Sequence, residues 1–227
     1  MCTEVSATVP DELVVLASGG ADSSILLVDQ AAQGRVVWPV YIRFGLAWEG
    51  VEETYLRRFL DAVSAQWAIR PLTVLELPIA DVYGSHWSVS GTDAPDDTTP
   101  DEAVYLPGRN LLLLAKTTVW CALHGVGTIA LGTLRGNPFA DSSPPFFSGL
   151  SAMAGLALGY RLEVITPFSD LSKAEVLERG RALPLEHTFS CVAPVGDRHC
   201  QTCNKCGERR KAFAAAGIDD RTPYATG

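Results

Sequence analysis

The sequence is poor in positive charge. Its 227 residues include 18 lysines and arginines against 26 aspartates and glutamates, which gives a net charge of −8. Proteins that track nucleic acids need clustered basic side chains to meet the phosphates, so direct nucleic-acid binding is disfavoured. A small anionic substrate is compatible with this charge, because free N–H groups at a helix start can hold it.

Long apolar runs are also missing. The apolar stretches are short and carry polar residues, so no membrane-spanning segment is expected. Residues 1–10 lack the basic and apolar regions of a secretory signal. We therefore expect a cytoplasmic protein, in a reducing compartment where clustered cysteines are metal ligands more often than disulfides.

The order of apolar and helical patterns predicts an α/β fold with a doubly wound, mostly parallel sheet. We expect a flexible tail over 1–10, a nucleotide-binding domain over 11–185, and a metal-binding C-terminal segment, 186–227, packed on that domain. The expected strands are 13–17, 36–44, 72–77, 128–132 and 162–165, and the expected helices are 25–32, 51–68, 109–124, about 146–158 and 172–180.

Segment 81–103 is rich in Ser, Thr, Asp, Gly and Pro, which predicts a long mobile loop. Loops of this length are either lids or surface insertions. As a lid, the segment would order over a bound substrate and exclude water, with Trp87 stacking on a planar ring. As an insertion, it would have no role in the chemistry.

A phosphate site is predicted at Ser18–Ser24 (SGGADSS), between the first expected strand and a helix. Its two glycines let the backbone approach a phosphate, and the N–H groups of the helix start point at it. The lysine-containing motif GxxxxGK[ST] and the motif GxGxxG are both absent. Asp22 is placed to hold Mg²⁺ or to orient the loop. An ordinary glycine-rich turn is the alternative interpretation.

A cluster of cysteines near the C-terminus predicts a metal site. The Cys-x-x-Cys-x-x-Cys run supplies three thiolates, and a fourth precedes it, so a closed tetrahedral Zn²⁺ site with a structural role is favoured. An iron–sulfur cluster, a redox dithiol and metal-free buried cysteines are the alternatives. His199 is either an additional ligand or a residue outside the ligand set, and Cys121 is expected in the core. The expected ligands are Cys191, Cys200, Cys203 and Cys206.

Further stretches follow one another along the chain. They are Leu106–Asn110 (LPGRN), Thr166–Phe168 (TPF), Leu171–Glu175 (LSKAE), and a cysteine run after Ser190 that precedes Arg209 and Ala212-Phe213. Together with the phosphate loop, they resemble the 7-cyano-7-deazaguanine synthase family of the PP-loop N-type ATP pyrophosphatases. The resemblance extends from about Leu13 to Phe213, with order and spacing kept.

This resemblance implies an adenine-nucleotide alpha-hydrolase-like, Rossmann-like fold and a homodimer. It implies that ATP with Mg²⁺ adenylates 7-carboxy-7-deazaguanine, that ammonia converts the adenylate to an amide, and that a second activation and dehydration give the nitrile. Each activation releases AMP and pyrophosphate. We expect Asp22, Lys173 and Arg109 to be catalytic, the last two by neutralising the departing pyrophosphate. The expected nucleotide-binding residues are Ser18, Gly19, Gly20, Asp22, Ser23, Ser24, Phe44, Gly132 and Thr133.

Three stretches depart from the family pattern. Gly45–Trp48 replaces a Gly-Gln-x-His segment, Gly136–Phe147 lacks the Arg and Glu of the corresponding family stretch, and Cys200–Cys203 lacks a glycine. One alternative is therefore a diverged ligase that couples the activated acid to an amine on a small molecule, peptide or protein. Others are a tRNA thiolase-like enzyme, which would need a basic surface and a reactive cysteine pair, and a catalytically silent ATP-binding module.

Overall fold

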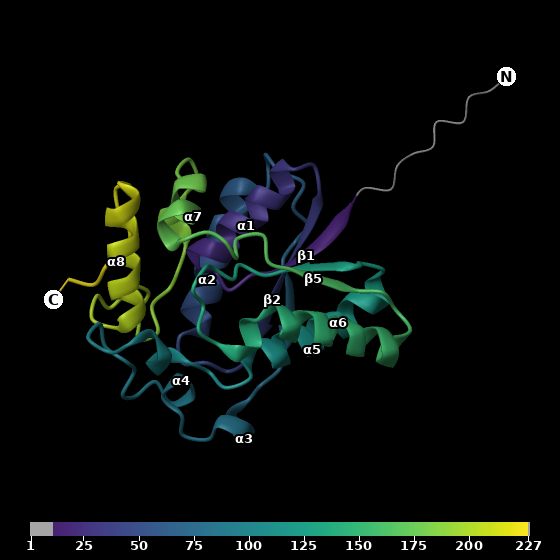
Figure 1. Cartoon of the computed structure of the whole chain (residues 1–227). Helices are drawn as coiled ribbons and strands as arrows, with labels where there is room; N and C mark the ends of the chain where they lie inside the picture. The colour runs from purple at the N-terminus through teal and green to yellow at the C-terminus, as the bar shows by residue number, and fades with distance from the viewer. Residues whose placement is uncertain (1–10, 227) are drawn as a thin grey trace.

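Five parallel strands form the central sheet of the computed structural model, which describes residues 11–226 (Figure 1). They are β1 (Glu12–Leu16), β2 (Val36–Arg43), β3 (Thr73–Glu76), β4 (Thr128–Ala130) and β5 (Glu163–Ile165). Their order in the sheet is β3-β2-β1-β4-β5, and every pairing is parallel. The predicted parallel α/β fold is confirmed. The tail expected at 1–10 lies outside the described residues.

Helices cover both faces of this sheet (Figure 1). The side chains of β1 alternate between two cores: Leu13 and Val15 pack into one, and Val14 and Leu16 into the other. All four are at most 8% exposed, as expected of a strand buried on both faces. The longer helices are α1 (Ala21–Ala32), α2 (Glu49–Val63), α5 (Arg109–His124), α6 (Pro144–Leu158), α7 (Lys173–Arg179) and α8 (Asn204–Ala216).

The helix boundaries agree with the sequence patterns in some places and differ in others. The capping box of α7 is confirmed, because Ser172 Oγ accepts from the Glu175 N–H while Glu175 accepts from the Ser172 N–H at 2.7 Å. Helix α1 begins earlier than expected, at Ala21, since the phosphate loop supplies its first turn. Helix α2 ends at Val63 rather than residue 68, because the chain then turns to pair Ile69 with Val37 of β2.

The expectation of a long loop without regular structure over 81–103 is wrong. The chain forms the short helices α3 (Ala80–Tyr83) and α4 (Trp87–Ser90) and the 3₁₀ turn η1 (Asp101–Val104). Its middle pairs with the cysteine-rich segment, through Asp97 N–H to Thr202 O at 3.0 Å and Asn204 N–H to Pro95 O at 2.9 Å. These main-chain pairs satisfy backbone hydrogen-bonding groups in a segment that has little apolar surface to bury.

Two further 3₁₀ turns are present. Turn η2 (Ala140–Ser142) precedes α6, and turn η3 (Leu185–His187) precedes the cysteine-rich segment. Helix α8 follows that segment and packs beside α7 (Figure 1). Within residues 11–226, no helix combines the length and the apolar character needed to cross a bilayer.

Candidate active site and metal centre

The phosphate loop lies where β1 ends and α1 begins. Gly19 has a φ of +70°, and a Cβ at this position would lie 3.0 Å from the main-chain oxygen of Glu52, so only glycine fits against α2. Ser18 N–H donates to Ser23 Oγ at 3.1 Å, which closes the loop on itself. The helix N-cap is Gly20, and no side chain caps the helix start. The first-turn N–H groups therefore have no side-chain acceptor and are available to an anion.

Two adjoining cavities open at the carboxyl ends of β1, β2 and β4, with volumes of about 450 Å³ and 180 Å³. This edge is where ligands bind in open α/β sheets. Gly20 lines the larger cavity, whereas Ser23, Phe44 and Thr133 line the smaller one. Gly19 and Ser24 line neither cavity. The residues shared by both cavities are Ser18, Asp22, Glu52, Arg109, Asn110, Gly132, Asn137 and Ser142.

A chain of ion pairs connects the phosphate loop to α8. Lys173 Nζ lies 2.6 Å from Asp22 Oδ2 and 3.5 Å from a carboxylate oxygen of Glu208. Glu208 also pairs with Lys205 at 2.6 Å. Burial lowers the pKa of Lys173, but the carboxylates of Asp22 and Glu208 more than offset it and raise that pKa above its ordinary value. Lys173 is therefore a cation at the cavity wall rather than a solvated helix residue.

Arg109 lies at the start of α5, directly over the junction of the cavities. Its neighbour Asn110 fixes this helix end, because its main-chain N–H donates to Asp141 Oδ2 at 3.0 Å and its side-chain amide donates to Ser142 Oγ at 2.8 Å. Among the described residues, Arg109 Nε is buried and has no hydrogen-bond partner. This donor is therefore available to a ligand.

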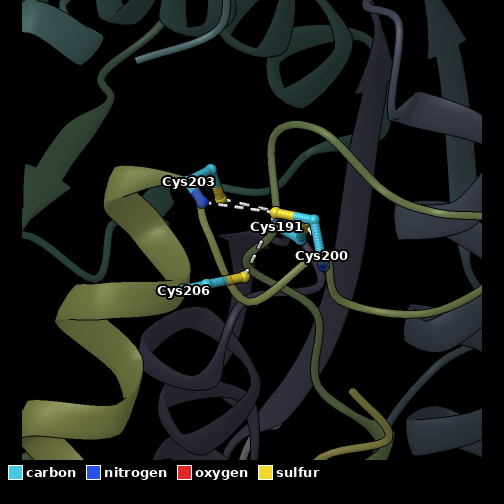
Figure 2. A group of neighbouring side chains, drawn as sticks. All are labelled: Cys191, Cys200, Cys203 and Cys206. Atoms are coloured by element: carbon cyan, nitrogen blue, oxygen red, sulfur yellow. Dashed lines mark hydrogen bonds between the residues drawn. The ribbon is translucent and has the colours of Figure 1, made fainter. Parts of the chain in front are cut away.

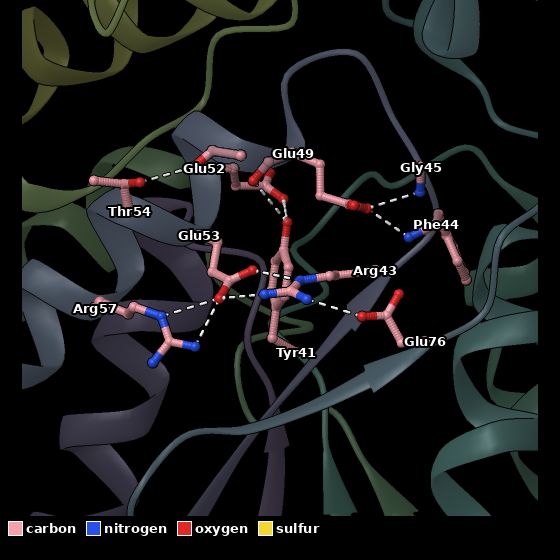
Figure 3. Close-up of polar contacts among 11 residues, drawn as sticks. Tyr41, Arg43, Phe44, Gly45, Glu49, Glu52, Glu53, Thr54, Arg57 and Glu76 are labelled. Atoms are coloured by element: carbon pink, nitrogen blue, oxygen red, sulfur yellow. Dashed lines mark hydrogen bonds and ion pairs between the residues drawn. The ribbon is translucent and has the colours of Figure 1, made fainter.

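Glu52 is a site residue that the sequence analysis missed. It is 8% exposed, lines both cavities and accepts a hydrogen bond from the Tyr41 hydroxyl at 2.8 Å (Figure 3). Burial raises the pKa of Glu52 to about 7, although Arg109 and Tyr41 act to lower it. A signal was present: Glu52 shares the buried helical face of Tyr55 and Phe59, where an acidic residue is unusual.

Two pairs of aromatic side chains form part of the larger cavity wall. Trp48 and Trp87 are stacked, with centroids 5.6 Å apart and an interplanar angle of 17°. Tyr105 and Phe139 are stacked at 4.7 Å and 21°. Such faces suit a planar heterocycle. In this structure, Trp87 lies against Trp48 in the cavity wall. Segment 81–103 therefore does not need to become ordered on ligand binding for Trp87 to reach the cavity.

The four predicted metal ligands converge (Figure 2). Their sulfur atoms all lie within 4.8 Å of one another, and the Cys191–Cys203 and Cys200–Cys206 sulfur pairs are 3.9 Å apart. A tetrahedral site with metal–sulfur bonds of ~2.3 Å has sulfurs roughly 3.8 Å apart, so the four thiols fit a metal ion. The sequence prediction of a metal site agrees with this geometry.

His199 is not part of this cysteine group. The residue is fully buried, accepts from the Ser190 N–H at 3.3 Å, and packs against the rings of Tyr55, Phe189 and Tyr224. It is therefore a packing residue behind the cysteine loop. The remaining cysteine of the described chain, Cys121, is in the core as predicted, and burial raises the pKa of its thiol to about 12.

The sheet order, the lysine-free loop after β1 and the cavities at the strand ends define the class, which is an adenine-nucleotide alpha-hydrolase-like fold with a PP-loop. A family model for the queuosine biosynthesis protein QueC matches residues 12–217, and the chain belongs to this family.

Proteins similar to this chain extend over nearly its whole length. The 7-cyano-7-deazaguanine synthase of Syntrophobacter fumaroxidans is 33% identical over an alignment 228 residues long, which covers 93% of this chain and 95% of that protein. The synthase of the same name from Azoarcus sp. is 31% identical over 223 residues, with 93% and 96% covered. A 4-thiouridine synthetase solved as an RNA complex with bound ATP has a TM-score of 0.53 and 16% identity, and covers 91% of this chain and 50% of that one. This last similarity concerns the fold alone.

The sulfur geometry predicts that metal content depends on each clustered cysteine. Cys203→Ser should lose bound metal and unfold at a lower temperature, because metal binding supplies folding free energy to this loop. Cys121→Ala is the matched control, since it removes a buried thiol that is outside the four-cysteine group and should keep the metal. Elemental analysis of both purified variants measures this. Equal metal content in Cys203→Ser and the unmodified protein would contradict a four-cysteine site.

Proposed function

We propose that the chain is an ATP-dependent, AMP-forming enzyme that builds a carbon–nitrogen bond on the carboxylate of a 7-deazaguanine. The acid becomes an adenylate, ammonia converts the adenylate to the amide, and a second activation followed by loss of water gives the nitrile. The observation that carries the proposal is the lysine-free phosphate loop beside two joined cavities. The full-length similarity to 7-cyano-7-deazaguanine synthases supports the nitrile as product.

ATP and the acid are proposed to occupy different cavities. The smaller cavity, lined by Phe44 and Thr133, takes the adenosine, while the phosphates lie against the loop Ser18–Ser23. The larger cavity, with its two stacked aromatic pairs, takes the deazaguanine ring. This arrangement brings the α-phosphorus and the acid's carboxylate together at the junction, where an in-line attack requires them.

Two cations are proposed to neutralise the phosphate charge, and Asp22 to position one of them. Lys173 and Arg109 stabilise the pyrophosphate as it leaves, and Asp22 orients Lys173 through their 2.6 Å ion pair. Asp22 Oδ1 is buried and has no protein partner among residues 11–226, which fits a Mg²⁺ ligand. Bound Mg²⁺ would neutralise phosphate charge beside these side chains.

We further propose zinc as the metal of the cysteine cluster. Four sulfur ligands within 4.8 Å of one another, two pairs of them at 3.9 Å, suit tetrahedral Zn²⁺ and leave no position open for chemistry, so the role is structural. Thiolate ligation requires reduced cysteines, which the cytoplasm supplies.

Coupling to an amine other than ammonia is the second candidate. The wall segment Gly136–Phe139 belongs to the stretch that lacks the family's Arg and Glu, and it lines the larger cavity. A changed wall favours a changed substrate or acceptor, carried by a small molecule, peptide or protein. Sulfur transfer to tRNA is disfavoured, since none of the described residues lining the two cavities is a cysteine.

Incubation with ATP, Mg²⁺, ammonium and 7-carboxy-7-deazaguanine should yield the nitrile, with two AMP and two pyrophosphate per product. Lys173→Met should lower kcat about 10²- to 10³-fold, the usual effect of removing one group that stabilises transition-state charge. Mass spectrometry of the heterocycle and nucleotide products measures both.

Lys116→Met is the matched control, because Lys116 bonds the main-chain oxygen of Glu76 and lines neither cavity. Release of ADP would contradict adenylation, and an amide that is not dehydrated would favour the second candidate.

A homodimer is proposed through the outer face of α5 and α6. Leu123 is 79% exposed, Met153 62% and Leu156 88%, which is a concentration of apolar side chains unusual for a surface open to water. A second copy of the same face would cover them symmetrically.

The double variant Leu123→Asp/Leu156→Asp should be monomeric when size-exclusion chromatography is combined with light scattering. Val82→Asp changes an equally exposed residue on α3 (73%) and should leave the dimer intact. A monomeric unmodified protein, or a dimeric double variant, would contradict this interface.

A further inference from the structure

Amide formation from an adenylate requires a proton acceptor. When ammonia attacks the acyl carbon, a C–N bond forms, the C–O bond to AMP breaks, and AMP leaves with the electron pair. The nitrogen must lose one proton to become a neutral amide. In the adenylate, an oxygen atom joins the acyl carbon to the α-phosphorus, which is proposed to lie at the junction of the two cavities. A base at this junction would therefore be within reach of the attacking nitrogen.

Two carboxylates line both cavities among the described residues, Asp22 and Glu52. Asp22 is already engaged by a cation, because its Oδ2 lies 2.6 Å from Lys173 Nζ. The other carboxylates near the cavities have partners. Glu49 accepts from the Phe44 and Gly45 N–H groups (Figure 3). Asp141 accepts from the Asn110 N–H. Glu208 is paired with Lys173 and Lys205.

Within residues 11–226, Glu52 is held in place without an ion pair. Tyr41 Oη donates to its Oε2 at 2.8 Å, and its main chain and Cγ lie against the loop at Gly19. The charged and titratable groups around it are Tyr41 from β2, Glu49 from the start of α2, Arg109 from α5 and Asp22 from α1. Its neighbour Glu53 differs, since it forms ion pairs with Arg43 and Arg57 and lines neither cavity (Figure 3).

We propose that Glu52 is the general base of the amine-transfer step, taking the proton from the attacking nitrogen as the adenylate collapses to amide and AMP. The products are the amide, AMP and a protonated Glu52, which returns its proton to solvent. This role rests on the proposed function. Burial raises the pKa of Glu52 to about 7, where a carboxylate accepts a proton more readily than at its ordinary value.

Glu52→Gln separates this step from adenylation. It keeps the size of the side chain and an oxygen that accepts from Tyr41, so acid-dependent exchange of labelled pyrophosphate into ATP should stay within a few-fold of the unmodified enzyme. Amide formation at saturating ammonium should fall about 10²- to 10⁴-fold in kcat, the usual contribution of a general base. Glu53→Gln is the matched control and should leave both rates nearly unchanged.

The pH profile gives a second readout. Unmodified enzyme should lose amide-forming activity as pH falls through about 7, because protonated Glu52 accepts no proton, and Glu52→Gln should lack this limb. Glu52→Asp keeps a carboxylate, so it should still lose activity as the pH falls, with a lower maximal rate. It replaces Glu52→Gln as the test if the glutamine variant fails to fold. Equal loss of exchange and amide formation would make Glu52 structural and overturn the proposal. Absence of exchange in the unmodified enzyme would instead reject the proposed function.

Discussion

The close approach of three backbones at the phosphate loop is the constraint on which the site depends. A Cβ at Gly132, just after β4, would lie 3.3 Å from the carbonyl carbon of Asp22 and from Ser23 N. A Cβ at Gly19 would lie 3.0 Å from the main chain of Glu52 on α2. With glycine at both positions, β4 and α2 press directly on the loop. Two acidic residues, Asp22 and Glu52, thereby reach the same cavity junction.

The cysteine loop contributes to the site as well as to the fold. Cys203 and Cys206 flank Lys205, and the first turns of α8 place Lys205 and Glu208 on the cavity wall. Glu208 holds Lys173, which in turn holds Asp22 of the phosphate loop. A metal bound by the cysteines would therefore fix the position of cavity-wall charges without touching a substrate. Segment 95–97 pairs with the same loop through main-chain hydrogen bonds.

Local patterns in the sequence predicted the features that depend on neighbouring residues. The strand–loop–helix around Gly19, the capping box at Ser172 and the cysteine cluster are of this kind, and each agrees with the structure. Helical spacing indicates that Glu52 is buried, but its approach to the phosphate loop depends on where α2 crosses that loop, which no local pattern encodes. Segment 81–103 was misjudged for a similar reason: the hydrogen bond from Asn204 to Thr99 O joins residues 105 positions apart.

Transfer of a labelled oxygen from the acid to AMP tests the central claim most directly. In the proposed reaction, a carboxylate oxygen attacks the α-phosphorus of ATP at the cavity junction, and the same oxygen leaves with AMP when the amine attacks the acyl carbon. With an acid labelled with heavy oxygen in its carboxylate, mass spectrometry should find one label in the AMP formed in the first activation. AMP without label, or label in ADP or inorganic phosphate, would contradict adenylation of the acid.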